Sequence, residues 1–221
     1  MDVSPSIVLA TWAGGVAAAA ALVARWEIVG PGFIRLSGAV VLGFGIPAAL
    51  AGSTPFPWVG VVLCAAAVLS ARWRTPLVVF MVVAAGCFVV AASLDGAFVP
   101  AASGALLLGG VTGEMMLGHW YLVDPRLPRE ALRRLAAIGA LGAVADFGVL
   151  AGFGAIPWAG FDPMFGVGFV LLGATTLVLM AAVWFALAEP GYSGVMAATG
   201  LSYLAVLTGF GSVVLGRILA G

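Results

Sequence analysis

The sequence has no lysine and little charge of any kind. Nine arginines and nine acidic residues make up only 8% of its 221 residues, and the net charge is zero. A chain with this balance has no basic tail or patch of the kind that binds nucleic acid. Hydrophobic residues make up 63% of the chain, which is more apolar side chain than a soluble core can bury. The composition therefore excludes a soluble globular protein and a nucleic-acid-binding protein.

Histidine and cysteine are also scarce. His119 is the only histidine, so a single chain cannot supply two histidine ligands to a haem. Cys64 and Cys87 fall near the middles of two predicted helices, where a thiol is typically a small apolar core group. The sequence contains no phosphate-binding loop with its lysine and no Gly-x-Ser-x-Gly elbow. We therefore predict no metal and no cofactor, and the pattern weighs against an enzyme without excluding one.

Long apolar runs fill most of the chain. They have the length of membrane-spanning helices, and about eight of them fit between Ser6 and Ala220, with no loop long enough for a separate domain. We predict an all-α, polytopic integral membrane helix bundle. The expected helices are Ser6 to Ala24, Phe33 to Ala51, Trp58 to Ala71, Leu77 to Ser93, Val99 to Val123, Leu135 to Phe153, Gly166 to Leu187 and Gly194 to Leu219.

The arginines are expected to lie on one side of the membrane. Eight of the nine fall in the first, third and fifth connections between predicted helices: Arg25, Arg35, Arg72, Arg74, Arg126, Arg129, Arg133 and Arg134. By the positive-inside rule this side is cytoplasmic, so we expect a bacterial plasma (inner) membrane protein with both termini outside. The loop from Glu189 to Gly191 would be cytoplasmic too, although it has no arginine. Asp2, Asp95, Asp162 and Trp158 would lie on the outer side.

Two segments of the chain resemble two others at a nearly constant offset. Arg25–Arg35 aligns with His119–Arg129 at an offset of 94, where tryptophan, valine, proline and arginine coincide. Pro57–Gly60 aligns with Pro157–Gly160 at an offset of 100. Four helices in each half would give both halves the same orientation, as in parallel-repeat transporters. We predict a 4+4 parallel repeat in one membrane domain, with halves 1–96 and 97–221.

Two carboxylates lie well inside apolar runs. A charge at the centre of a membrane helix costs about 2.5 to 3.5 kcal/mol on insertion scales, so such a residue is a functional candidate. Glu114 should lie about 10 to 14 Å from the inner end of its helix, and Asp146 about 16 Å from the start of its own at Leu135. These depths predict that the two acids face each other across a shared pocket. The other sixteen charges, Arg217 among them, are assigned to rims and loops.

A histidine and a polar rim follow Glu114 toward the arginine side. His119 can exchange a proton near neutral pH, so it is a candidate relay between the inner solution and the buried acids; it can equally be part of an interfacial aromatic belt. Tyr121, Asp124, Arg126 and Arg129 would form a polar inner rim whose arginines can contact lipid phosphates. The segment from Pro128 to Leu135 is expected to start a helix, with Pro128 in its first turn.

The leading functional hypothesis is a small proton-coupled carrier or permease that uses Glu114 and Asp146 as proton, ion or substrate sites and His119 as relay. A second hypothesis is a non-catalytic subunit or assembly factor of a respiratory or cofactor-handling complex. A third is an enzyme that modifies a lipid or isoprenoid at the inner interface. The expected partners are the bilayer and either further copies of the chain or a membrane complex.

Overall fold

The protein is an all-helical bundle. The computed structural model describes residues 4–152 and 163–220, and no strand occurs in that part of the chain. Asp2, Phe153, the segment Pro157–Gly160 with Trp158, and Asp162 lie outside the described residues. The helices are α1 (Pro5–Arg25), α2 (Pro31–Ala51), α3 (Phe56–Leu69), α4 (Arg74–Asp95), α5 (Phe98–Val123), α6 (Arg129–Gly152), α7 (Pro163–Ala186) and α8 (Tyr192–Ala220).

The membrane class predicted from composition is confirmed. Seven of the helices in the described ranges are long and apolar enough to cross a membrane, whereas α3 has only 14 residues and is shorter than the other seven. Proline in the first turn helps to define several helix starts, because its missing N–H is not needed there; Pro5 and Pro31 are examples. The α6 helix begins at Arg129, six residues before the Leu135 start of the predicted apolar span, which agrees with the prediction that the segment from Pro128 to Leu135 starts a helix.

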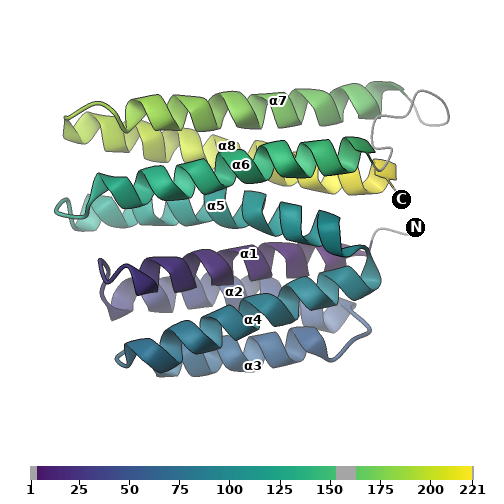
Figure 1. Ribbon diagram of the computed structural model, residues 1–221, viewed down its shortest axis with the longest axis horizontal. Coiled ribbons are helices and arrows are strands. Elements are labelled where there is room, and N and C mark those ends of the chain that lie inside the picture. Colours follow the sequence, from purple (N-terminus) through teal and green to yellow (C-terminus); the bar gives the residue numbers. More distant parts are fainter. Residues whose placement is uncertain (1–3, 153–162, 221) are drawn as a thin grey trace.

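The helices form two groups of four that lie side by side (Figure 1). In one group α1 contacts α2 and α4, and α3 packs between α2 and α4; in the other α5 contacts α6 and α8, and α7 packs between α6 and α8. Contact between α1 and α5 joins the groups. On this junction the Trp12 ring of α1 stacks on Phe44 of α2, with ring centroids 4.2 Å apart, and lies 4.8 Å from the Phe210 ring of α8.

Glycines allow the central helices to approach at backbone distance. A Cβ on Gly109 of α5 would lie 2.7 Å from the Cα of Gly15 on α1. One turn further along, a Cβ on Gly113 would lie 2.8 Å from the Cβ of Ala19. Such small-residue crossings replace the hydrophobic driving force that lipid does not provide. The smooth face predicted on α6 is confirmed, since Gly139, Gly142, Ala143 and Asp146 are all buried.

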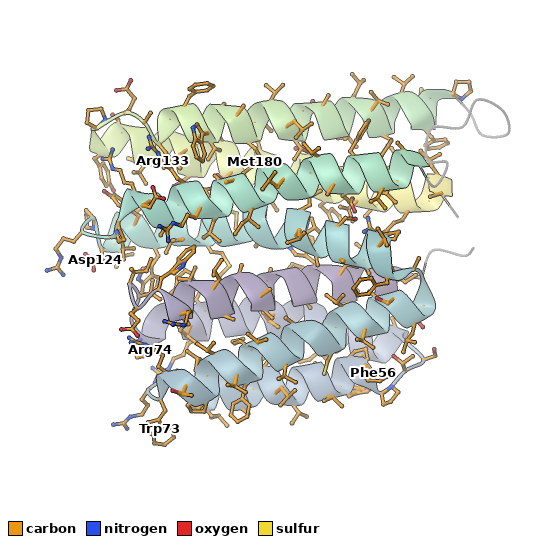
Figure 2. The ribbon with its side chains drawn as sticks, viewed as in Figure 1. Phe56, Trp73, Arg74, Asp124, Arg133 and Met180 are labelled. Carbon is orange, nitrogen blue, oxygen red and sulfur yellow. The ribbon has the colours of Figure 1, made fainter. Side chains whose placement is uncertain are left out.

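The bundle has one arginine-rich end. The connections α1–α2, α3–α4, α5–α6 and α7–α8 all lie at the left of Figure 1, and eight of the nine arginines lie in the first three connections or in the adjoining turns of the helices. Figure 2 labels Arg74, Asp124 and Arg133 at this end and Phe56 at the other. Arg217, near the end of α8, lies toward the opposite end of the bundle. We refer to the two as the arginine end and the opposite end.

Candidate functional site

Glu114 lies fully buried in the middle of α5. Its side chain is 0% exposed, and its Oε2 accepts a hydrogen bond from the Ser202 hydroxyl of α8. Its other oxygen, Oε1, is buried without a hydrogen-bond partner. None of the ion pairs within the described ranges includes Glu114. An ionised carboxylate here would carry a charge that no cation in the described chain balances, which is the costly situation in an apolar interior.

The Ser202 hydroxyl has two possible acceptors. Besides Glu114, its oxygen lies 2.9 Å from the carbonyl oxygen of Ala198 on the same helix. A serine hydroxyl has one proton to donate, so it can serve only one of these acceptors at a time. When Glu114 is ionised, Ser202 can donate to it; when Glu114 is protonated, the acid can donate to Ser202 and Ser202 can donate to Ala198. The pair can therefore accommodate both protonation states of Glu114 by rotating one hydroxyl.

His119 lies one turn and a half from Glu114 toward the arginine end. It is exposed, and its Nδ1 lies 3.4 Å from the hydroxyl oxygen of Tyr203, which itself is 46% exposed. Tyr203 directly follows Ser202 in α8. Two adjacent residues of α8 thus contact the two candidate residues of α5, Glu114 in the interior and His119 at the surface. The rise of an α-helix separates these two contacts by about 7.5 Å along α5.

Asp146 belongs to a different polar cluster. Its Oδ1 accepts hydrogen bonds from the Ser103 hydroxyl of α5 at 2.7 Å and from the Arg217 guanidinium of α8 at 3.2 Å. The guanidinium also donates to the carbonyl oxygen of Val213, at 3.1 Å, and to that of Pro100. Asp146 and Arg217 are 1% and 7% exposed, so this is a buried ion pair. Gly104 leaves the space through which the arginine passes, because a Cβ there would lie 3.1 Å from its Cζ.

The predicted common pocket of Glu114 and Asp146 is wrong. The partners of Asp146 on α5 and α8 are Ser103 and Arg217, whereas Glu114 is itself on α5 and binds Ser202 on α8. Ser103 and Glu114 are eleven residues apart in α5, which corresponds to about 16 Å along the helix. The error comes from the start of α6: because the helix begins at Arg129, Asp146 lies about 25 Å from that start and not about 16 Å.

Arg217 is the functional-site candidate that the sequence prediction missed. Its sequence position, close to the end of the last predicted helix, predicts a location on a rim, whereas the side chain is buried. The signals that could have identified it were its position inside an apolar run, away from the other eight arginines, and the need of a buried aspartate for a cation.

The predicted inner rim divides into three different environments. Tyr121, two residues before the end of α5, is only 6% exposed and packs in the core. Asp124 and Arg126 form an exposed ion pair at 3.1 Å. The Arg129 guanidinium donates to the backbone carbonyls of the α7–α8 connection, Glu189, Pro190 and Gly191. The connection that lacks an arginine of its own is thus bound by one from α6.

The ion pair between Asp124 and Arg126 lies between α5 and α6, outside the membrane-spanning helices, and it predicts how the protonation of Asp124 depends on pH. Hydrogen bonds from the Arg126 side chain and backbone lower the pKa of Asp124 below its ordinary value. Replacing Arg126 with methionine removes the side-chain donor, so the pKa of Asp124 should rise toward the ordinary value. Any stabilisation from the ionised Asp124 is present above the pKa of the unfolded chain and is lost as pH falls through the folded pKa. Carbon NMR of labelled aspartate would detect the rise, and an unchanged titration would contradict the assignment.

Within the described ranges, no group of three histidine, cysteine, aspartate or glutamate residues is placed to hold a metal ion. Cys64 is buried beside the carbonyl oxygen of Gly38, and Cys87 is partly exposed; both are free thiols. The reactive side-chain groups of the described residues are carboxylates, hydroxyls, guanidinium groups, the two thiols and one imidazole. Comparisons with protein-family models, with curated proteins and with solved structures find no match for this chain.

Proposed function

We propose that the protein is a small proton-coupled carrier in which Glu114 binds and releases the transported proton. The observation that carries the proposal is the fully buried Glu114 carboxyl, with one neutral partner, Ser202, and one oxygen that has none. Because no ion pair within the described residues includes this carboxyl, its charge would have to be neutralised by a proton or balanced by a bound cation. An intramembrane acid of this kind is typical of proton pathways.

The contacts on α8 support a route for the proton. Ser202 can follow the protonation state of Glu114 by donating to it or to Ala198. His119 contacts the neighbouring Tyr203 and lies four residues from the end of α5, so its imidazole is placed to pass a proton between the arginine end and Glu114. In this mechanism His119 is the relay and Glu114 the binding site. Rotation of hydroxyls or small helix movements would connect the two.

Asp146 has a supporting role in this proposal. Its charge is balanced by Arg217, so it is less suited than Glu114 to exchange a proton alone. The pair joins α6 to α8 and, through Ser103 and Pro100, to α5. We therefore assign Asp146 and Arg217 to holding together the helices that surround Glu114.

The proposal includes two halves related by a parallel repeat, 1–96 and 97–221. The offset of 94 makes Gly15 equivalent to Gly109, and Ala19 equivalent to Gly113. In both pairs the equivalent residues lie against each other at the α1–α5 junction. Contact between equivalent residues one turn apart is what a two-fold axis running between two parallel helices requires, which supports the repeat. The second half alone carries Glu114, since its equivalent is Ala20.

The arginine distribution supports an orientation with the arginine end in the cytoplasm of a bacterial cell and both termini outside. This orientation places His119 between the cytoplasm and Glu114.

Infrared spectroscopy of the reconstituted protein would test the proton site directly. We expect a carboxyl C=O band that changes with pH and with exchange into D₂O, that disappears in Glu114→Gln and that remains in Asp124→Asn. A proton flux into proteoliposomes, driven by an imposed membrane potential, should fall in Glu114→Gln to the level of empty vesicles and stay unchanged in the control. If the titrating band and the flux both survive in Glu114→Gln, the proposal is wrong.

A further inference from the structure

A hollow opens at the arginine end of the first half, far along the chain from Glu114. Its volume is about 300 Å³, and it lies between the end of α1, the start of α2, the α3–α4 connection and the start of α4. Arg72 and Arg74 line it, together with Gly30 and Pro31 at the start of α2. In Figure 2 Arg74 is labelled at this end of the bundle, next to Trp73.

Positive charge at the hollow exceeds the negative charge available to balance it. Glu27 forms an ion pair with Arg74, which leaves further N–H groups of that guanidinium free. Arg72 makes no hydrogen bond or ion pair with the described part of the chain. Arg25 and Arg35 add two more cations to the rim of this half, where Glu27 is the only acid. An unpaired guanidinium beside a cavity is suited to a bidentate anion such as phosphate.

The start of α2 adds backbone donors close to the hollow, one and two residues beyond its lining residue Pro31. Gly30 is the N-cap residue, Pro31 has no N–H, and no side chain caps the helix, so the next N–H groups, those of Gly32 and Phe33, have no side-chain acceptor. The positive end of the helix dipole at this position also favours an anion. These donors and the two arginines come from separate elements.

The remaining lining of the hollow is apolar. Ala24, Ile34 and Leu77 are each at most 5% exposed and form part of its wall, together with Val29 and Ala71. A purely ionic solute would gain nothing from these side chains, but a molecule with a phosphate and an adjoining apolar part would bury that part against them.

We infer that the hollow is a binding site for the phosphate group of an anionic amphiphile, with Arg72 as its principal ligand. The shared chemistry is a phosphate that carries net negative charge. It can belong to an anionic phospholipid of the surrounding leaflet or to a phosphorylated solute that enters from the aqueous side. The inference does not depend on the proton-carrier proposal, because it uses none of the residues around Glu114.

Native mass spectrometry of the full-length protein in detergent would test this site. The protein is titrated with phosphatidylglycerol and, separately, with phosphatidylcholine of the same chain length, whose choline offsets the phosphate charge. We expect tighter retention of phosphatidylglycerol, weakened about tenfold in Arg72→Gln, as for loss of a hydrogen bond to a charged group. The matched control is Arg126→Gln, an exposed arginine at the same end whose side chain is 90% exposed; it should bind as the wild type does.

Inorganic phosphate added to the phosphatidylglycerol complex distinguishes the two sources. Displacement of the lipid by inorganic phosphate would identify a site that binds the phosphate group itself and is accessible to phosphorylated solutes. Retention of the lipid would identify a lipid site. The inference is overturned if Arg72→Gln retains phosphatidylglycerol as well as the wild type does, or if Arg126→Gln loses it equally, since the latter would indicate only diffuse attraction to the arginine end.

Discussion

Replacing Arg217 with methionine should destabilise the protein by about 3 to 5 kcal/mol, as expected when one partner of a buried ion pair is removed. The substitution leaves Asp146, which is 1% exposed, with the Ser103 hydroxyl as its one remaining side-chain partner among the described residues. It also removes the donors to the Pro100 and Val213 carbonyls. Methionine fills a similar volume without polar atoms, so the effect would come from the lost charge and hydrogen bonds. Reversible unfolding in mixed micelles, followed by tryptophan fluorescence, would measure it.

Two variants separate the loss of the pair from a general effect of removing an arginine. Arg126→Met breaks an exposed ion pair and should change stability little, because water solvates Asp124 when its partner is gone. Asp146→Leu combined with Arg217→Met removes both buried charges and should recover much of the lost stability. If Arg217→Met alone unfolds at the wild-type denaturant concentration, the pair does not stabilise the α5–α6–α8 junction.

The fold class could be predicted because it depends on composition and run length. Apolar runs of membrane-spanning length leave few alternatives to helices, and the positions of most helices follow from where the arginines and prolines interrupt those runs. Hydropathy alone places the apolar span of α6 from Leu135. The helix itself begins earlier, at Arg129, because Arg129, Arg133 and Arg134 are good helix formers although they interrupt the apolar run.

The site could be predicted in part. A lone acid in an apolar run is conspicuous, so Glu114 and Asp146 were both identified, and both are buried. The distance between Glu114 and Asp146 could not be predicted, because it depends on the register between α5 and α6. That register is set by backbone contacts such as that of Gly110 with Gly139. Arg217 was missed because a charge close to a helix end has the same sequence signature whether it points into solvent or into the bundle.

The polar contacts of the α7–α8 connection show the same limit. Nothing in the segment from Glu189 to Gly191 indicates that its carbonyl oxygens bind Arg129, sixty residues earlier in the chain. Such contacts arise from the antiparallel packing of α6 and α7 and are properties of the tertiary structure alone.

Replacing Gly109 with alanine should also destabilise the protein strongly, by about 1 to 3 kcal/mol. The added methyl group would lie 2.7 Å from the Cα of Gly15, and it would meet backbone atoms, which cannot move aside as a flexible side chain can. Helices α1 and α5 would have to separate, which would also disturb the 2.9 Å hydrogen bond from the Trp12 indole to the Thr112 hydroxyl. Unfolding in mixed micelles would give the change in stability.

The matched control for this substitution has the opposite expected sign. Gly86, in the interior of α4, has no atom within 4 Å of the position that a Cβ would occupy. Alanine there should stabilise the protein by up to about 1 kcal/mol, because alanine has the higher helix propensity. Alanine has the same advantage in helix propensity at Gly109. A net loss of stability in Gly109→Ala would therefore mean that the clash between α1 and α5 costs more than this propensity gain. If Gly109→Ala and Gly86→Ala both stabilise the protein, the two halves do not meet at backbone distance.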